Sequence, residues 1–314
     1  MPDVAKALWT PTGESIANSR MNRFAQMVNE SGDLHAWSIN QPEQFWSLVW
    51  DDCGVVGHKG ERSFLAAQPG EPMSTARFFP DASLSVVENM LATGGSGEAL
   101  VAIDEAGNRR SRSWDELRNR VSSIASALQT RGVVAGDRVV AWLPNSIEAI
   151  EVMLGAASIG AVFSSSSPDF GANGVLDRFG QIAPKVLFAV DGYLYNGKQF
   201  DCLERLAEIS KGLPTVVETV VVSNIGTTVP TGTMSYSDFV DSGAAAPVSS
   251  QRFSFDHPWY VLYSSGTTGV PKCIVHRTGG VLLQHMKEHQ LHCNVQHGDR
   301  VMYFTTTGWM MWNW

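Results

Sequence analysis

One segment governs the interpretation of this chain: Tyr263-Ser264-Ser265-Gly266-Thr267-Thr268-Gly269-Val270-Pro271-Lys272. It directly follows an apolar run that begins at Trp259, and the pattern places it between a buried strand and a helix. Its glycines carry no side chain, so backbone N–H groups can approach an anion, and its hydroxyls add hydrogen-bond donors. The ammonium group of Lys272 adds a positive charge. The segment therefore predicts a loop that holds the phosphate groups of a nucleoside triphosphate.

Two other interpretations of this segment are weaker. A flexible linker rich in serine and glycine has no need of the Pro271-Lys272 ending. A Walker-type loop requires the pattern G-x-x-x-x-G-K-[ST], whereas here Pro271 precedes Lys272 and Cys273 follows it. The sequence therefore excludes a kinase or GTPase of the Walker type.

The chain after residue 98 predicts alternating strands and helices. An apolar run at 99–103, a turn and a return through Arg110 predict a hairpin, and Ser113 with Glu116 forms a capping box that starts a helix ended by Gly132. The further predicted elements are strand 138–143, helix 146–159, strand 161–164, helix 174–182, strand 185–190, helix 201–211, strand 216–222, a loop at 226–250, strand 259–263, helix 279–292 and strand 300–305. Parallel neighbours in a sheet need a crossover connection, so this order predicts an α/β fold of parallel-rich sheets with helices on both faces.

The first part of the chain has a different pattern. Gln41-Pro42 precedes Phe45, Leu48 and Val49, whose spacing gives a helix one apolar face. Tryptophans are frequent there and strand patterns are rare. We therefore expect a helical N-terminal cap over residues 1–80 and a second domain over 81–314.

Composition and charge exclude several classes of protein. With 44% hydrophobic and 17% charged residues the chain has the composition of a folded globular protein. Its 314 residues carry a net charge of -8, so no overall attraction to nucleic acid or anionic lipid is expected. Residues 1–9 do not form a signal peptide, and glycines interrupt the longest uncharged stretch, so no membrane anchor is expected. Four scattered cysteines without a C-x-x-C pair favour reduced thiols and a cytoplasmic location.

Histidines on one predicted helix face do not indicate a metal site. His285, His289 and His292 share that face with Cys293 beside them, but the spacing is not H-E-x-x-H and no carboxylate is placed as a base. We interpret the group as a polar helix face and predict no metal-binding residue in this chain.

The phosphate-loop segment resembles the signature loop of the adenylate-forming enzymes, which include acyl-CoA synthetases. The runs at 136–140, 143–146 and 157–161 are similar to the core of those synthetases, and the cap is similar to that of the acetyl-CoA synthetase branch. Runs at 167–179, 195–198 and 308–314 are similar to the acetoacetyl-CoA synthetases in particular. The resemblance implies that residues 81–314 form the first part of the AMP-binding domain and end inside its aromatic motif.

The resemblance also implies roles for individual residues. The residues implied to contact the ATP phosphates are Ser264, Ser265, Gly266, Thr267, Thr268, Gly269 and Lys272, and the catalytic ones among them are Lys272, Thr267 and Thr268. The residues implied to line the acyl pocket are Trp309, Met310 and Met311, and those implied to contact CoA are Ser165, Asn196 and Lys198. Without the resemblance, the Met/Trp cluster is interpreted as core and the CoA candidates as ordinary surface loops.

The activity implied is that of an acid–thiol ligase. Acetoacetate, ATP and CoA would be its substrates, acetoacetyl-AMP its intermediate and Mg²⁺ its metal, with no stable protein partner. The adenine-binding loop, the Mg²⁺ ligand, the hinge and the C-terminal domain of such enzymes would follow Trp314, so we expect this chain to be inactive alone and poorly soluble. A non-catalytic regulatory or interaction fragment, and a ligase for acetate or another short acid, are the alternatives.

Overall fold

The computed structural model describes residues 7–28, 33–92, 94–244, 251–264 and 269–314. The chain divides into two compact units. Unit 1 contains residues 1–55, 59–81 and 281–302, and unit 2 contains residues 56–58, 82–280 and 303–314. The predicted division at residue 80 stays a prediction; in this structure residues 281–302 group with the N-terminal segment.

Unit 1 is mainly helical. Its elements are α1 (Gly13–Ala17), α2 (Arg20–Met27), α3 (Leu34–Asn40), α4 (Pro42–Asp52), β2 (Phe64–Leu65), η1 (Met73–Thr75), β3 (Arg77–Phe78), most of α11 (Thr278–Lys287) and the π-helical turn η2 (Glu288–His292). Pro42 occupies the first turn of α4, where its missing N–H costs nothing. Aromatic side chains fill the core of the unit, with Phe24 fully buried and Trp50 beside Phe79 at 4.9 Å.

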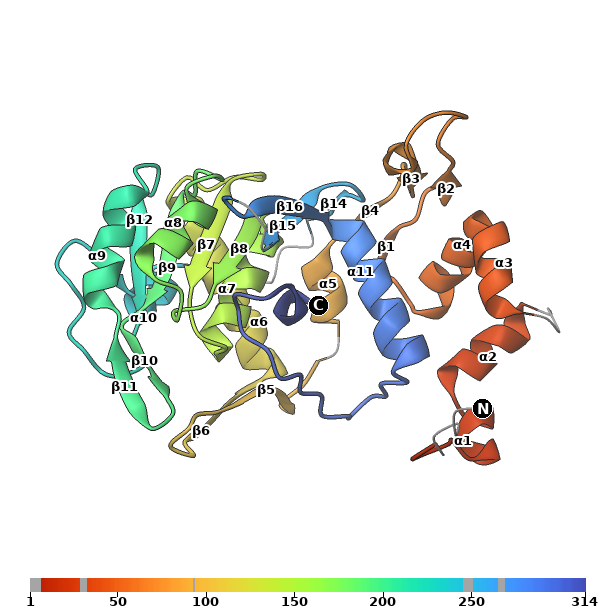
Figure 1. Cartoon of the computed structure of the whole chain (residues 1–314), viewed down its shortest axis with the longest axis horizontal. Helices are drawn as coiled ribbons and strands as arrows, with labels where there is room; N and C mark the ends of the chain where they lie inside the picture. Colours follow the sequence, from red (N-terminus) through yellow and green to blue (C-terminus); the bar gives the residue numbers. More distant parts are fainter. Residues whose placement is uncertain (1–6, 29–32, 93, 245–250, 265–268) are drawn as a thin grey trace, which may run out of the picture. The chain divides into compact units, whose positions relative to one another are not determined.

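Unit 2 is built on a mostly parallel sheet (Figure 1). Within the described residues the sheet has the order β13-β12-β9-β7-β8-β15-β16. Its strands are β7 (Arg138–Trp142), β8 (Val162–Ser166), β9 (Val186–Val190), β12 (Glu218–Val222), β13 (Met234–Ser235), β15 (Pro258–Ser264) and β16 (Lys272–Arg277). All neighbours are parallel except β15 and β16. The central strands β8 and β9 are buried along their whole length, as expected for strands covered on both faces.

The helices of unit 2 form two groups. Its helices are α5 (Val86–Met90), α6 (Trp114–Thr130), α7 (Ile147–Ser158), α8 (Ala172–Phe179), α9 (Leu203–Gly212), α10 (Tyr236–Asp241) and α12 (Met310–Asn313). Helix α6 packs on α7 and α10, whereas α8 packs on α9. The chain passes from β7 to β8 in one direction through α7 and from β8 to β9 in the other through α8. Because such crossovers are right-handed, α7 and α8 lie on opposite faces of the sheet. The predicted α/β fold is confirmed.

Short strands complete unit 2. Hairpins are formed by β5 (Glu98–Ile103) with β6 (Arg109–Ser113) and by β10 (Gly192–Tyr195) with β11 (Lys198–Asp201), and a small sheet by β1 (Gly57–His58), β4 (Ser83–Leu84) and β14 (Phe253–Ser254). The capping box of Ser113 and Glu116 is present at the start of α6. None of the helices in the described part of the chain has both the length and the apolar composition needed to span a membrane.

Three local predictions were wrong. Residues 226–250 are not one loop, because Ser235 caps the short helix α10, which buries Phe239 and Val240. Residues 300–305 form no strand, because no described strand pairs with them. The phosphate-loop segment does not lead into a helix, since β16 lies between it and α11.

Candidate phosphate-loop site

The predicted phosphate loop joins two antiparallel strands at the border of the main sheet. Ser264, the last residue of β15, is the cross-strand partner of Lys272, the first residue of β16. The Lys272 side chain is exposed, and its ammonium group has no hydrogen-bond or ion-pair partner among the described residues. Gly269 has φ +94°, a left-handed conformation that glycine adopts readily. Both ends of the loop are therefore fixed by the strand ladder, and the Lys272 ammonium group stays available to an anion.

Four of the residues predicted to contact phosphate lie outside the described residues. These are Ser265, Gly266, Thr267 and Thr268. Their roles, including the catalytic ones of Thr267 and Thr268, stay predictions. The described part of the site consists of Ser264, Gly269 and Lys272.

The strand end before the loop is held by the half-buried Tyr263 side chain. Tyr263 Oη lies 3.0 Å from Ser164 Oγ, and Ser164 Oγ donates to the Val261 carbonyl at 2.7 Å. Burial raises the pKa of Tyr263. This phenol therefore stays neutral at physiological pH and serves to position β15 rather than to accept a proton.

The carboxyl ends of β7 and β8 are tied to the segment before α12. Ser165 Oγ donates to the Thr307 carbonyl at 2.7 Å, and the Thr307 hydroxyl donates to the Leu143 carbonyl. Trp312 Nε1 donates to Asn145 Oδ1 at 2.9 Å. In parallel α/β sheets, ligands bind beyond the carboxyl ends of the strands, which is where these contacts and Ser264 lie.

The predicted acyl-pocket residues lie at the start of α12, next to this edge. Trp309 and Met310 are exposed and Met311 is half-buried. The backbone reaches this position through Gly308, where an added Cβ would come within 2.6 Å of Phe170 Cε2. The close approach fixes the motif against the loop after β8, but the role of the three side chains in acyl binding stays a prediction.

The predicted CoA residues lie in two different settings. Ser165 is 4% exposed and its hydroxyl is already used by Thr307. Asn196 and Lys198 are exposed at the tip of the β10–β11 hairpin, where Glu105 accepts hydrogen bonds from the Asn196 and Gly197 amides at 3.0 Å each. Within the described residues no hydrogen bond connects Ser165 to this hairpin. The structure leaves Asn196 and Lys198 as the accessible candidates, and all three CoA assignments stay predictions.

The histidine group contains no evident metal ligand set. The rings of His285 and His289 are stacked with centroids 6.0 Å apart, and His292 Nδ1 lies 3.6 Å from Glu288 Oε2. No group of three His, Cys, Asp or Glu side chains suited to a metal ion occurs in the part of the chain that the structure describes.

Sequence reasoning gave no individual role to Asn145 and Thr307. Asn145 follows a buried strand after one proline, and a polar residue at the carboxyl end of a parallel strand is a signal that can be read from the sequence. Thr307 gave no such signal, because its role depends on two partners that are far from it in the chain.

Comparison with known proteins points to one family. The sequence profile of the family described as "AMP-binding enzyme" matches residues 91–313. An acetoacetyl-coenzyme A synthetase of Rhizobium meliloti is 46% identical over 98% of this chain and 49% of its own length. An acetoacetyl-CoA synthetase of Danio rerio is 40% identical over 99% of this chain and 49% of its own length.

A solved structure gives the same result at the level of the fold. The acetoacetyl-CoA synthetase from Streptomyces lividans matches 98% of this chain and 49% of its own chain, with a TM-score of 0.90 and 40% identity. The chain thus spans about half the length of the relatives it matches.

Proposed function

Because this chain belongs to the AMP-binding enzyme family, we propose that it supplies the phosphate-binding half of an ATP-dependent ligase that joins acetoacetate to CoA. The single observation that carries the proposal is the exposed Lys272 directly across the ladder from Ser264, at the two ends of the phosphate-loop segment. The names of the relatives support acetoacetate as the acid.

The proposed reaction has two steps. A carboxylate is a poor acyl donor because its oxygen is a poor leaving group. In the first step a carboxylate oxygen of acetoacetate attacks the α-phosphorus of ATP, the bond to pyrophosphate breaks, and acetoacetyl-AMP forms. In the second step the sulfur of CoA attacks the acyl carbon, the bond to AMP breaks, and the thiol proton is released.

The role of this chain in the first step is electrostatic. Lys272 and the hydroxyls of the loop would stabilise the negative charge that develops on the departing pyrophosphate. No described side chain needs to act as a nucleophile. Mg²⁺ would supply further charge stabilisation when bound. No group of three His, Cys, Asp or Glu side chains suited to a metal ion occurs among the described residues, and no residue of this chain is proposed to hold Mg²⁺.

The test is pyrophosphate exchange into ATP, which reports the first step alone. We expect exchange that depends on acetoacetate in a polypeptide with the length of the relatives, and none in this chain by itself. Absence of acetoacetate-dependent exchange from both would overturn the proposed function. A preference for acetate over acetoacetate would overturn the choice of acid and leave the ligase chemistry standing.

The same assay separates a non-catalytic fragment from an incomplete enzyme. A fragment that only regulates a partner needs no intact phosphate loop, so replacing Lys272 would leave its effect on that partner unchanged. An incomplete enzyme loses exchange in the longer polypeptide on the same replacement.

A further inference from the structure

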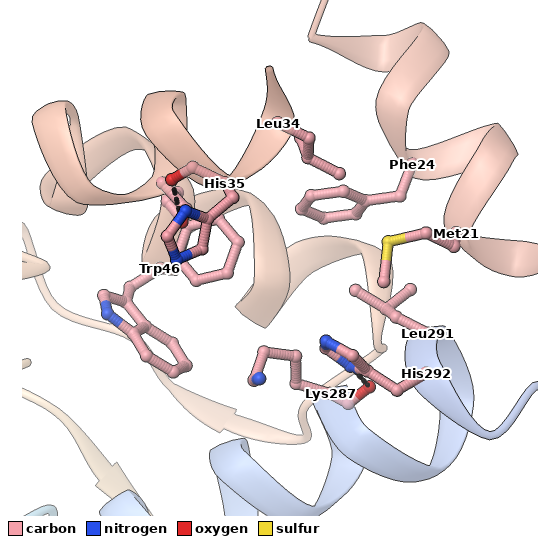
Figure 2. A pocket seen from close by; sticks show the side chains of 10 residues that line it. Met21, Phe24, Leu34, His35, Trp46, Lys287, Leu291 and His292 are labelled. Atoms are coloured by element: carbon pink, nitrogen blue, oxygen red, sulfur yellow. Dashed lines mark hydrogen bonds between the residues drawn. The ribbon is translucent and has the colours of Figure 1, made fainter. Parts of the chain in front are cut away.

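Unit 1 contains a cavity of about 460 Å³ that the proposed reaction does not use. It lies among α2, α3, α4, the end of α11 and the turn η2 (Figure 2). Its size falls within the range of pockets that bind small organic molecules, about 300–1,000 Å³. The cavity therefore qualifies as a binding site on volume alone, and its lining decides what it would bind.

The walls of the cavity are apolar and partly aromatic. The apolar lining residues are Met21, Phe24, Leu34, Phe45, Trp46 and Leu291. Phe45 meets Phe24 edge to face at 6.1 Å and Trp46 at 5.0 Å, which gives the wall a rigid aromatic corner. Leu34, Phe45 and Trp46 are only half-buried although they are apolar. An apolar chain in the cavity would cover them.

One side of the cavity carries the cationic Lys287 side chain beside the imidazole ring of His292. Figure 2 shows Lys287 and His292 across the cavity from Phe24 and Leu34. The Lys287 side chain is 12% exposed, and its ammonium group donates to Glu288 Oε1 at 2.7 Å. Glu288 also accepts from Gln284 at 2.8 Å. An ammonium group has three N–H donors, so Lys287 keeps donors for a ligand beside this partner.

Among the described lining residues there is no acidic side chain. Besides Lys287 and His292, the polar members of the lining are His35 and Ser38. Glu288, the partner of Lys287, is not a lining residue, so a ligand cation would meet no acidic side chain in the described lining. A fully apolar ligand would leave without a partner the N–H donors that Lys287 does not use for Glu288. The lining thus fits a molecule with an apolar body and one anionic end.

We infer that unit 1 binds an amphipathic carboxylate, with its hydrocarbon chain along the aromatic wall and its carboxylate on Lys287. A straight-chain fatty acid of medium length has this chemistry. The inference is independent of the proposed ligase activity, because the residues that carry it belong to unit 1 and none of them lies in the phosphate-loop segment.

The test is a calorimetric titration of the 314-residue chain with butanoate, hexanoate, octanoate and octan-1-ol. Each added methylene is expected to strengthen binding about fourfold, which corresponds to about 0.8 kcal/mol per buried CH₂. Octanoate is expected to bind at least tenfold more tightly than octan-1-ol, because only the carboxylate forms a charged hydrogen bond with Lys287.

Variants locate the site. Lys287→Met is expected to weaken octanoate binding at least tenfold and to leave octan-1-ol binding within about twofold. Lys59→Met is the matched control, because Lys59 is also paired with a carboxylate in unit 1, Asp51 at 2.6 Å, but does not line the cavity. Ser38→Phe fills the cavity from a half-buried position and is expected to abolish binding of both ligands.

Three results would overturn the inference. The first is that the wild type does not bind octanoate saturably. The second is that the wild type and Lys287→Met bind octanoate with equal affinity, and the third is that Ser38→Phe still binds both ligands fully. Thermal unfolding of each variant shows whether a loss of binding comes from misfolding, and Ser38→Phe provides the answer if Lys287→Met does not fold.

Discussion

Ser264 and Lys272 face each other across the β15–β16 ladder, so the two ends of the phosphate-loop segment lie one strand spacing apart. Such a spacing is about 4.8 Å. The ladder fixes the base of the loop and sets the Lys272 ammonium group beside it.

Replacing Lys272 tests this arrangement. Lys272→Met is expected to lower acetoacetate-dependent exchange about 10²-fold to 10³-fold in the longer polypeptide, because one preorganised charge on the departing pyrophosphate is lost. Lys211→Met, an exposed lysine on α9, is the control and should leave exchange unchanged. Equal exchange rates for the two variants would remove Lys272 from the site.

The contact of Gly308 with Phe170 allows a steric test of the aromatic motif. An added Cβ would come within 2.6 Å of Phe170 Cε2, so Gly308→Ala is expected to displace α12 and to lower stability by about 1–3 kcal/mol. The apparent KM for the acid should rise more than that for ATP. Gly280→Ala, with nothing within 4 Å of its added Cβ, should leave both KM values unchanged and should not lower stability.

The exposed lysine of the β10–β11 hairpin gives a test for CoA. Lys198→Ala is expected to raise the apparent KM for CoA several-fold, and more at low salt, because a single exposed charge on a phosphate is screened by ions. The exchange reaction, which needs no CoA, should be unaffected. An unchanged KM for CoA would show that the hairpin does not contact it.

Two buried glutamates on α7 have pKa values shifted in opposite directions. Burial raises the pKa of Glu148, but the hydrogen bond with Arg110, the Arg110 charge and further hydrogen bonds together outweigh this, so the net shift is downward. Burial raises the pKa of Glu151, and the hydrogen bonds from Tyr236 and Arg112 do not cancel the effect.

These shifts predict opposite dependences of stability on pH. The contribution of Glu148 to folding stability is present above the ordinary pKa of a glutamate and is lost as pH falls through the lowered pKa of Glu148. That of Glu151 is present below the ordinary pKa and is lost as pH rises through its raised pKa. The free energy of unfolding should therefore be measured with urea across pH 3–8. The difference between wild type and Glu148→Gln should shrink in acid, and the difference between wild type and Glu151→Gln should shrink at higher pH. If the free energy of unfolding depended on pH in the same way in all three proteins, the two pKa shifts would be contradicted.

The border strand predicts self-association. Val275 is 55% exposed and Ile274 is 42% exposed, and neighbours in a strand point to opposite faces, so both faces of β16 present apolar side chains. Among the described strands only β15 pairs with β16. Val275→Lys should reduce concentration-dependent association in sedimentation velocity. Val217→Lys, also at an exposed valine but not on this strand, should not.

Much of the fold could be predicted because it depends on local signals. The capping box of Ser113 and Glu116, the proline of α4 and the apolar runs of β7 and β9 each specify an element by themselves. The border strand β16 was missed because its side chains are mostly exposed, and no periodic apolar pattern marks it. Residues 300–305 were wrongly predicted as a strand because an apolar run does not reveal whether a partner strand exists.

The candidate site was predictable as a set of segments but not as an arrangement. The sequence identified the phosphate-loop segment and the runs around Asn145, Ser165 and Trp312. The hydrogen bonds that join these runs, Trp312 to Asn145 and Ser165 to Thr307, connect residues more than a hundred positions apart and follow only from the folded sheet. The burial of the Ser165 hydroxyl has the same origin.

The hairpin connection of β16 has a consequence for the energetics of the sheet. A strand that borders one neighbour and is joined to it without a crossover can detach while every parallel pair stays intact. Local opening of this kind costs far less free energy than global unfolding. Lys272 is therefore carried by a border strand whose opening leaves the parallel pairs intact, and amide hydrogen exchange should be faster in β16 than in β8.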